Sequence, residues 1–381
     1  MRVLAHVFLS LLSTTATAGN PLFLDNASAA TSADARPSSF EVIARLYDLD
    51  PSGVAVTDNR MFLSFPKHDA DHSGPVLGEW RDGRIVPFPS AAMASATDGD
   101  PEQRLISVHG ITTDSRGRLW VIDDGKVQGH AIPAGGAKVV GFDPISGRVV
   151  GKVVVQSALR ADSHLNDLRI DLTHGPAGTA YVSDSSFNGH PALVVIDLAS
   201  GRQRRVLAED QRLGADPGYQ TVLEGRVLSQ SAQPPAFPGG GVDGLALSPD
   251  SSVLYFAALS SRRLYSLPTN LLADFEQTDE SLAAAITDLG EKGAADGLAT
   301  DPWGRLYTTA ADHDAVFRRN LDGSFEQLAH DSRFIWPDGI FANGNYLYVV
   351  MGQWTRLPRF HSGIDRRQSP YLVIRMPITP P

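Results

Sequence analysis

Six short segments of the chain share one pattern: a polar residue, then glycine or aspartate, then an apolar residue that opens an apolar run. In a repeated structure the equivalent positions come together, so these polar residues would meet around one axis. Three of them are carboxylates and one is a carboxamide, the oxygen ligands that Ca²⁺ and Mg²⁺ prefer. The six polar residues are Ser52, His109, Asn166, Asp243, Asp296 and Asp338.

This convergence predicts two kinds of chemistry. Asn166, Asp243, Asp296 and Asp338 could bind Ca²⁺ or Mg²⁺, because buried carboxylates that meet repel one another unless they are protonated, hydrated or bound to a cation. His109, Asp243 and Asp296 are candidates for catalytic proton transfer, with the cation polarising a substrate oxygen. A structural alternative stays open, in which each aspartate caps a turn around a water-filled channel.

The elements that position these residues are expected to be strands. Each polar residue is followed by an alternating apolar strand, a tight turn and a second strand rich in β-branched and aromatic residues. The turns at 114–117 and 301–304 place Asp first and Gly last, as type I turns prefer. A third and usually a fourth strand follow. Six such units predict an all-β protein, a single six-bladed β-propeller of four-stranded antiparallel blades.

Two further segments complete this organisation. A strand predicted over 40–47 precedes the first unit, whereas the last unit ends after its third strand at 371–376. We expect the N-terminal strand to become the outer strand of the last blade and to close the ring. The Gly-, Pro- and Gln-rich segment 212–241 is predicted to be a long loop inserted within or after one blade.

The first 18 residues have the features of a signal peptide: Arg2, an apolar run over 3–12, and the sequence Ala-Thr-Ala at 16–18. An N-terminal core helix is the alternative. We expect cleavage after Ala18, a flexible lead-in over 19–39 and the propeller over 40–381. The mature protein is then expected to be secreted or periplasmic and without a membrane anchor, because no later segment is apolar enough to span a bilayer.

The composition excludes several classes of function. The chain has no cysteine, which rules out disulfides and thiolate chemistry. The net charge is −10 and no block of Lys and Arg stands out, which argues against nucleic acid as a partner. No glycine-rich loop has the strand-to-helix context of a phosphate loop. We expect a monomer that binds a small molecule, with neither a nucleotide nor a haem.

The loops that follow the second strands are expected to surround the same mouth of the channel. The second strand of a blade runs back toward the end where the first strand begins, and binding residues concentrate on such loops. Solvated loop histidines are the simpler interpretation for the imidazoles among them. The residues expected to bind a ligand there are His68, Asp123, Asp184, His313 and Trp354.

Five segments resemble the yellow / major royal jelly protein family. They read ITTDSRGRLWVIDDG at 111–125, AYVSD at 180–184, VIDL at 195–198, LGEKG at 289–293 and WPDG at 336–339, and they keep the order of that family. The resemblance implies a secreted six-bladed propeller, with animal members that include pigment-pathway enzymes acting on dopachrome and proteins that bind small amines. The absence of cysteine departs from the animal members, and the leader suits a bacterial exported member.

The openings of the six units are also similar to those of the gluconolactonase / senescence-marker family, in which this position carries a divalent metal. That family has an additional Glu in its first unit, where this chain has Ser52. The two resemblances together favour a tautomerase or lactone hydrolase that acts on a small cyclic or aromatic metabolite at the channel mouth. Two alternatives stay open: a non-catalytic carrier of a small ligand, and a protein-interaction scaffold.

Overall fold

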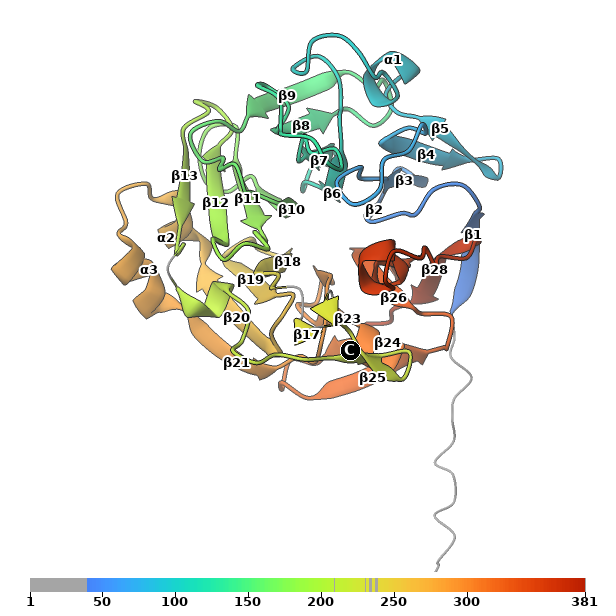
Figure 1. Cartoon of the computed structure of the whole chain (residues 1–381). Coiled ribbons are helices and arrows are strands. Elements are labelled where there is room, and N and C mark those ends of the chain that lie inside the picture. The colour runs from blue at the N-terminus through green and yellow to red at the C-terminus, as the bar shows by residue number, and fades with distance from the viewer. Residues whose placement is uncertain (1–39, 209, 230, 233–234, 237–238, 381) are drawn as a thin grey trace, which may run out of the picture. The chain divides into compact units, whose positions relative to one another are not determined.

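The computed structural model describes residues 40–380 except 209, 230, 233–234 and 237–238. The predicted signal peptide, residues 1–18, and the lead-in, 19–39, lie outside the described residues. Six four-stranded antiparallel sheets follow one another around a central axis (Figure 1), which confirms the predicted six-bladed propeller. Their inner strands are neighbours around that axis: β2, β6, β10, β18, β22 and β26.

Each of the first five sheets is built in chain order from its inner to its outer strand. The alternating apolar residues of the inner strands form the core between neighbouring blades. The strands of these sheets are β2 (Val54–Thr57), β3 (Arg60–Ser64), β4 (Leu77–Arg81) and β5 (Arg84–Pro87); β6 (Val108–Thr113), β7 (Leu119–Asp123), β8 (Lys138–Phe142) and β9 (Val149–Val154); β10 (Leu165–Asp171), β11 (Thr179–Asp184), β12 (Ala192–Asp197) and β13 (Gln203–Val206); β18 (Val242–Leu247), β19 (Val253–Ala258), β20 (Arg263–Pro268) and β21 (Thr287–Glu291); β22 (Leu298–Thr300), β23 (Leu306–Ala310), β24 (Ala315–Arg319) and β25 (Phe325–His330).

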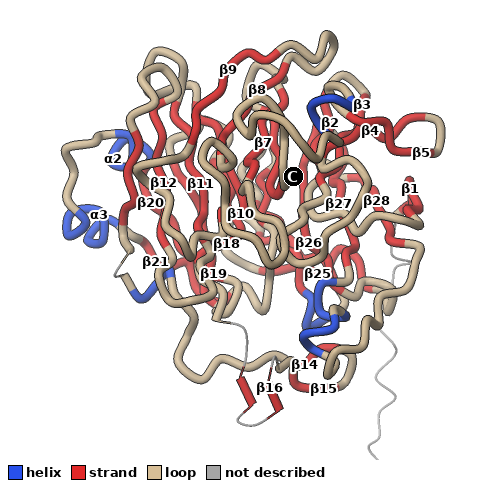
Figure 2. Tube along the Cα trace, turned by 45° about the horizontal axis from the view of Figure 1, so that its top comes forward, coloured by secondary structure: helices blue, strands red, loops and turns tan. Residues whose placement is uncertain are grey.

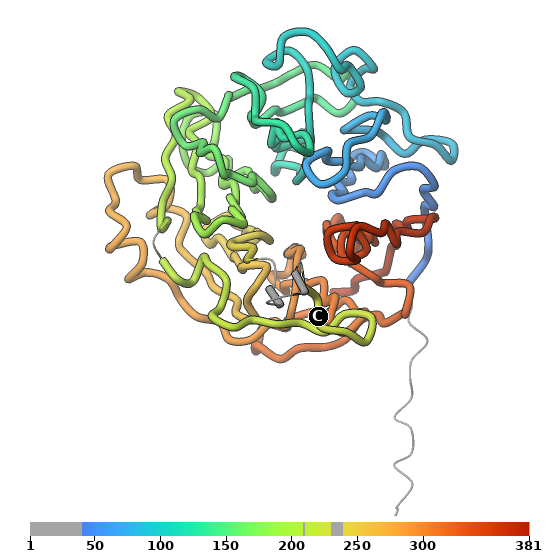
Figure 3. The backbone as a smooth tube through the Cα atoms, in the orientation of Figure 1, coloured from blue at the N-terminus to red at the C-terminus, as the bar shows by residue number. Residues whose placement is uncertain are grey.

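The sixth sheet joins the two ends of the described chain. Its strands are β26 (Trp336–Asn343), β27 (Tyr346–Gly352), β28 (Tyr371–Pro377) and, outermost, β1 (Glu41–Leu46). Figure 3 shows the blue start of the chain beside its red end. The Arg375 guanidinium also binds the Glu41 carboxylate at 2.6 Å across this pairing. The predicted closure by the N-terminal strand is therefore confirmed, and it removes a free sheet edge.

Aspartate side chains hold the turns between the first two strands of a blade. The Asp114 carboxylate accepts hydrogen bonds from the backbone N–H of Arg118 at 3.1 Å and from the indole N–H of Trp120 at 2.8 Å. Asp301 occupies the equivalent place in the fifth blade and accepts from the Tyr307 hydroxyl at 2.7 Å. These bonds tie each turn to an aromatic residue of the second strand, which explains why the two residue types recur together.

The small residue that follows the polar residue at the start of a unit lets neighbouring inner strands approach closely. A Cβ atom at Gly244 would lie 2.2 Å from the carbonyl oxygen of Asp296, and one at Gly339 would lie 2.4 Å from that of Ser52. The third blade has Asp167 at this position, and its carboxylate accepts a backbone N–H from the next blade at 3.0 Å. The ring is therefore packed backbone to backbone around the channel.

The predicted insertion at 212–241 lies between the third and fourth blades, and it contains two short strand pairs (Figure 2). Leu223 and Leu228 pack against Trp336, Leu357 and Phe360 beside the channel mouth. A search of the described residues for helices that could span a bilayer finds none. The short elements are β14 (Val222–Leu223), β15 (Arg226–Val227), β16 (Ser231–Ala232), β17 (Pro235–Ala236), α1 (Ala91–Ala94), α2 (Thr269–Ala273), α3 (Asp279–Ala285) and the 3₁₀ turns Gln211–Leu213, Ala311–His313, Trp354–Arg356 and Pro358–Phe360.

Candidate functional site

The six polar residues that open the repeated units meet in one cavity of about 240 Å³. They also line the narrower part of the channel next to it. Because each comes from a different blade, the predicted convergence is observed. The residues are Ser52, His109, Asn166, Asp243, Asp296 and Asp338.

Three histidines form a cluster on one wall of this cavity. His68 follows β3, His109 lies in β6 and His164 precedes β10, so each comes from a different blade. Their ring centroids are 4.4, 4.5 and 5.2 Å apart. One ring nitrogen from each lies within 4.8 Å of the others, and within the described residues no other three His, Asp or Glu side chains form such a group. The three imidazoles could hold a metal ion.

Groups outside the cavity orient two of the rings. His68 Nδ1 lies 2.7 Å from the carboxylate of buried Asp124, and His109 Nδ1 lies 3.2 Å from the carbonyl oxygen of Leu165. These contacts leave Nε2 of both rings available to the cavity. The ring of His164 makes no hydrogen bond to any described residue, although His164 is only 6% exposed.

The three imidazoles differ in their affinity for a proton. Burial, and then the positive charge of His68, lower the pKa of His109 to about 3. The same two causes lower the pKa of His164 well below its usual value. Burial also disfavours the charged form of His68, but the Asp124 carboxylate outweighs it and raises the pKa of His68. The cluster therefore presents two uncharged rings beside one that can carry a proton.

Carboxyl groups form another part of the cavity. Burial, and then the nearby carboxylate of Asp296, raise the pKa values of Asp243 and Asp338 well above the usual range. Burial also raises the pKa of Asp296 to about 6, although the indole N–H of Trp336 opposes this by donating to its carboxylate at 2.7 Å. These carboxyl groups can therefore hold protons near neutral pH.

A buried lysine acts on the same carboxyl groups. Lys292 belongs to the LGEKG segment, and its ammonium group donates to three backbone carbonyl oxygens at 2.9, 3.1 and 3.2 Å. Burial lowers the pKa of Lys292 to about 8, while the carboxylates of Asp243 and Asp296 act in the opposite direction. Lys292 is thus a cation held in place next to the acidic part of the cavity.

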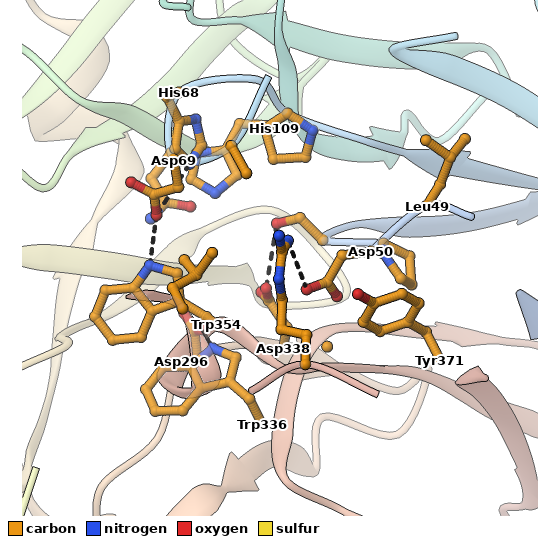
Figure 4. A pocket seen from close by; sticks show the side chains of 18 of the residues that line it. Leu49, Asp50, His68, Asp69, His109, Asp296, Trp336, Asp338, Trp354 and Tyr371 are labelled. Carbon is orange, nitrogen blue, oxygen red and sulfur yellow. Dashed lines mark hydrogen bonds and ion pairs between the residues drawn. The ribbon is translucent and has the colours of Figure 1, made fainter. Parts of the chain in front are cut away.

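Aromatic side chains complete the cavity. The rings of Trp336 and Trp354 lie 4.9 Å apart between centroids, and Tyr371 lines the cavity near Asp50 (Figure 4). The indole N–H of Trp354 donates to Asp69 at 2.5 Å. His68 and Trp354, two of the five residues expected to bind a ligand, therefore do line the cavity.

The other three residues expected to bind a ligand lie outside the cavity lining, which corrects their expected position. Asp123 and Asp184 are fully buried, and His313 has a side chain that is 54% exposed. Asp123 accepts from the Lys138 ammonium at 2.7 Å, and Asp184 pairs with Arg205. Both carboxylates point back into the blade, because they bind backbone N–H groups of the segment that leads to the inner strand.

That backbone contact gives Asp184 an indirect part in the site. Its Oδ1 accepts the backbone N–H of His164 at 2.8 Å, which positions the histidine at the cavity wall. Asp123 makes the equivalent bond to the backbone N–H of Ser107 at 2.9 Å. The two aspartates are therefore positioning residues of the inner strands.

The sequence prediction missed several cavity residues that share one place in the repeat. Three residues that line the cavity stand two positions before the polar residue that opens a unit: Asp50, His164 and Trp336. Burial raises the pKa of Asp50 to about 7, although the Arg367 guanidinium opposes this. Their shared position in the repeated unit is the sequence signal that could have identified these residues.

The profile of the family described as major royal jelly protein matches residues 106–369. The chain belongs to the major royal jelly protein family. This confirms the resemblance seen in the sequence. The chain is 25% identical over 194 residues to major royal jelly protein 7 of Apis mellifera, a match that covers 49% of this chain and 40% of that relative. The match therefore spans less than half the length of that curated family relative.

Solved propeller structures are similar to this family member over most of its length. A luciferin-regenerating enzyme has a TM-score of 0.51 at 13% identity and covers 89% of this chain and 95% of its own. A gluconolactonase from Xanthomonas campestris has a TM-score of 0.50 at 12% identity, with 89% of each chain covered. A putative gluconolactonase has a TM-score of 0.51 at 11% identity and covers 90% and 94%. At these identities the likeness shows the fold alone.

Proposed function

We propose that this major royal jelly family member is an enzyme that moves protons on a small cyclic or aromatic metabolite, in a tautomerisation or a lactone hydrolysis. The observation that carries the proposal is the meeting of uncharged imidazoles and proton-holding carboxyl groups in one cavity of about 240 Å³. Neighbouring titratable groups with pKa values that are pushed apart, here about 3 for His109 and about 6 for Asp296, are typical of acid–base sites.

The shape and lining of the cavity support the choice of substrate. Trp336, Trp354 and Tyr371 present flat apolar surfaces, which favour a ring-shaped ligand. The volume lies below the range of about 300–1,000 Å³ that is common for drug-sized ligands. One ring, or two fused rings, with polar substituents would fit between the aromatic side chains and the polar groups.

Asp296 is the group best placed to exchange a proton with such a substrate. Its pKa of about 6 lies near a physiological pH, where a general acid or base is most effective. The indole N–H of Trp336 holds one carboxylate oxygen at 2.7 Å, and the carboxyl group of Asp243 also hydrogen-bonds to Asp296. Asp243 can return a proton to a different atom of the substrate, because its own pKa is raised. His109 then offers the unprotonated nitrogen of an uncharged ring to a substrate hydroxyl group, from which it can accept a hydrogen bond, or to an ion.

A second candidate function is a carrier of a small organic cation. Trp336 and Trp354 offer ring faces to a cation, and the carboxyl groups of Asp50 and Asp243 line the same cavity, where a bound cation would favour their ionised form. The acidic net charge of −10 favours the same class of ligand. A carrier would bind its ligand without converting it.

A kinetic comparison tests the proposed enzyme. The purified protein would be assayed with quinone-type tautomers and with small lactones, and Asp296→Asn should lower kcat by about 10²–10⁴-fold with little change in KM. If ionised Asp296 acts as the base, kcat/KM should increase as the pH rises through about 6. His313→Gln is the control, because its exposed ring lies outside the cavity lining. Binding of these compounds without turnover would contradict the enzyme and support the carrier.

We also propose that the chain is exported after removal of residues 1–18. The charged start, the apolar run and the Ala-Thr-Ala sequence support this. N-terminal sequencing of the protein from cell fractions should find a chain that begins at Gly19 outside the cytoplasm. A chain that keeps Met1–Ala18 in the soluble cell fraction would contradict it.

A further inference from the structure

The histidine cluster has the donor set of a transition-metal site. His68, His109 and His164 each bring one ring nitrogen to within 4.8 Å of the other two. A Zn²⁺ ion binds imidazole nitrogen at about 2.0–2.1 Å, so modest rotations of the rings would bring all three onto one ion. Three histidines with one open position are a known ligand set of catalytic zinc.

The surroundings of the three rings match what metal-bound histidines need. A ligating histidine usually gives its second ring nitrogen to a carboxylate or a backbone carbonyl, which fixes the tautomer. The Nδ1 atoms of His68 and His109 have such partners in Asp124 and in the carbonyl oxygen of Leu165. Their Nε2 atoms are therefore left to face the cavity.

The third ring borders the cavity and has no hydrogen-bond partner among the described residues. His164 is 6% exposed, lines the cavity and makes no hydrogen bond from its ring within the described residues. Its ring nitrogens are therefore open to a ligand in the cavity. The backbone N–H of His164 donates to the Asp184 carboxylate at 2.8 Å, so a residue of the same blade fixes the place of His164 at the cavity wall.

The charge around the cluster suits a divalent cation. Asp124 touches His68, and an oxygen of Asp69 lies 3.9 Å from His68 Nε2. Asp69 is in turn held by the Trp354 indole and the Arg359 guanidinium, each at 2.5 Å. The cluster thus has negative charge close by that does not itself occupy the centre of the three rings.

We propose that His68, His109 and His164 bind one divalent transition-metal ion, with Zn²⁺ the best match, and leave a coordination position open to the cavity. Imidazole nitrogen suits Zn²⁺, Cu²⁺ and Ni²⁺, whereas Ca²⁺ and Mg²⁺ prefer oxygen. The Ca²⁺ or Mg²⁺ site predicted from the sequence lies at other residues, Asn166, Asp243, Asp296 and Asp338. This site does not depend on the proposed proton transfer, because it rests only on the three rings and their partners.

Cobalt and zinc titrations test the site directly. The purified protein is freed of metal with chelator and titrated with Co²⁺, whose visible absorption reports its ligands and geometry, and Zn²⁺ affinity is measured by calorimetry. We expect one ion per chain with a four- or five-coordinate Co²⁺ spectrum. His109→Gln and His164→Gln should each abolish binding at concentrations that saturate the unchanged protein, and Asp124→Asn should weaken it about 10–100-fold.

Two control variants decide where an ion binds. His313→Gln removes an exposed imidazole outside the cavity lining and should leave the affinity unchanged. Asp243→Asn removes a carboxyl group of the cavity and should leave the Co²⁺ spectrum unchanged. Melting curves of the metal-free variants show whether each is folded, and His68→Gln replaces any variant that is not.

Three outcomes would overturn the site: no stoichiometric binding, binding that survives both His109→Gln and His164→Gln, and binding that is lost only in Asp243→Asn. The last result would place the ion at the carboxyl groups. Because the readout is metal content and spectrum, an inactive protein that still binds one ion would contradict the proposed enzyme and leave the metal site standing.

Discussion

The two halves of the propeller ring use the same position of the repeated unit for different chemistry. Blades one to three place Ser, His and Asn there, whereas blades four to six place Asp in all three. The backbone is alike in both halves: the first strand has an irregular register between Val108 and Ile111 in the second blade and between Val242 and Leu245 in the fourth. Side-chain type therefore makes the difference between the halves.

A nearly symmetric ring of blades can therefore hold an asymmetric site. The carboxyl half crowds like charges, so burial and mutual repulsion raise its pKa values. In the imidazole half, Asp124 lies outside the cavity lining and orients His68 from behind. The carboxyl side of the cavity can thus bind and release protons, and the imidazole side offers nitrogen ligands.

Each half also contains one buried lysine, and these provide the largest expected effects. Lys138 pairs with buried Asp123, so Lys138→Met should lower the free energy of unfolding by about 3–5 kcal/mol, because a buried carboxylate is left without its cation. Lys292 donates only to backbone carbonyl oxygens, so Lys292→Met should cost about 1–3 kcal/mol. Urea unfolding followed by circular dichroism measures both.

The matched control for the lysine variants is Lys152→Met. Lys152 is exposed, and its change should stay within about 0.5 kcal/mol of the unchanged protein. A larger loss for Lys292→Met than for Lys138→Met would show that the carboxyl half depends on the lysine as a counter-charge, and the comparison of the halves would have to be revised.

The backbone ring shared by both halves predicts the next largest effect. A Cβ at Gly110 would lie 2.5 Å from the carbonyl oxygen of Asn166, and one at Gly244 would lie 2.2 Å from that of Asp296. Gly110→Ala and Gly244→Ala should therefore each destabilise the fold by about 1–3 kcal/mol, as measured by thermal melting. Gly214→Ala is the control, since its nearest atom would be 3.6 Å away. Tolerance of either ring variant would mean that neighbouring inner strands within that half can move apart.

The smallest expected effect is a pH dependence on the acidic side of the cavity. The pKa of Asp50 is about 7 in the folded protein against 3.8 as its ordinary value, so the folded state binds this proton more tightly. Stability is therefore lost as the pH rises from about 4 to 7, and the full cost is present above pH 7. Asp50→Asn should stabilise the protein by about 1–2 kcal/mol at pH 8 and by little at pH 4.

Melting curves of Asp50→Asn at pH 4 and pH 8 measure this effect. Asp98→Asn in an exposed loop is the control and should change neither value. A stabilisation that is equal at both pH values would show that the effect comes from packing, and an ionised Asp50 would then be tolerated in the folded protein.

The strands and turns could be predicted because their signals are local. Alternating apolar residues and Asp-to-Gly turns depend on neighbours a few positions away, and the closure of the last blade followed from an unpaired strand at each end. The meeting of His109 with Asp243, Asp296 and Asp338 was predictable for a related reason, since equivalent positions of a repeat must converge.

The remainder of the site depends on contacts between blades. His68 and Asp124 are 56 positions apart in the chain, and no local sequence pattern near either residue predicts their contact at 2.7 Å. Asp123 and Asp184 were expected at the cavity because they end second strands, but their carboxylates bind the segments that precede the inner strands. The direction of a side chain at a strand end is set by the donors that neighbouring segments offer.

The repeat and its apolar pattern were therefore enough to predict the blade count, the closure and the set of polar residues at the channel. The folded ring was needed to show that His164 joins His68 and His109, and that Lys292 lies near the carboxyl groups. Metal binding and pKa shifts depend on separations of a few ångströms between atoms of different blades. The closure of the ring of blades sets those separations, and no local sequence pattern predicts them.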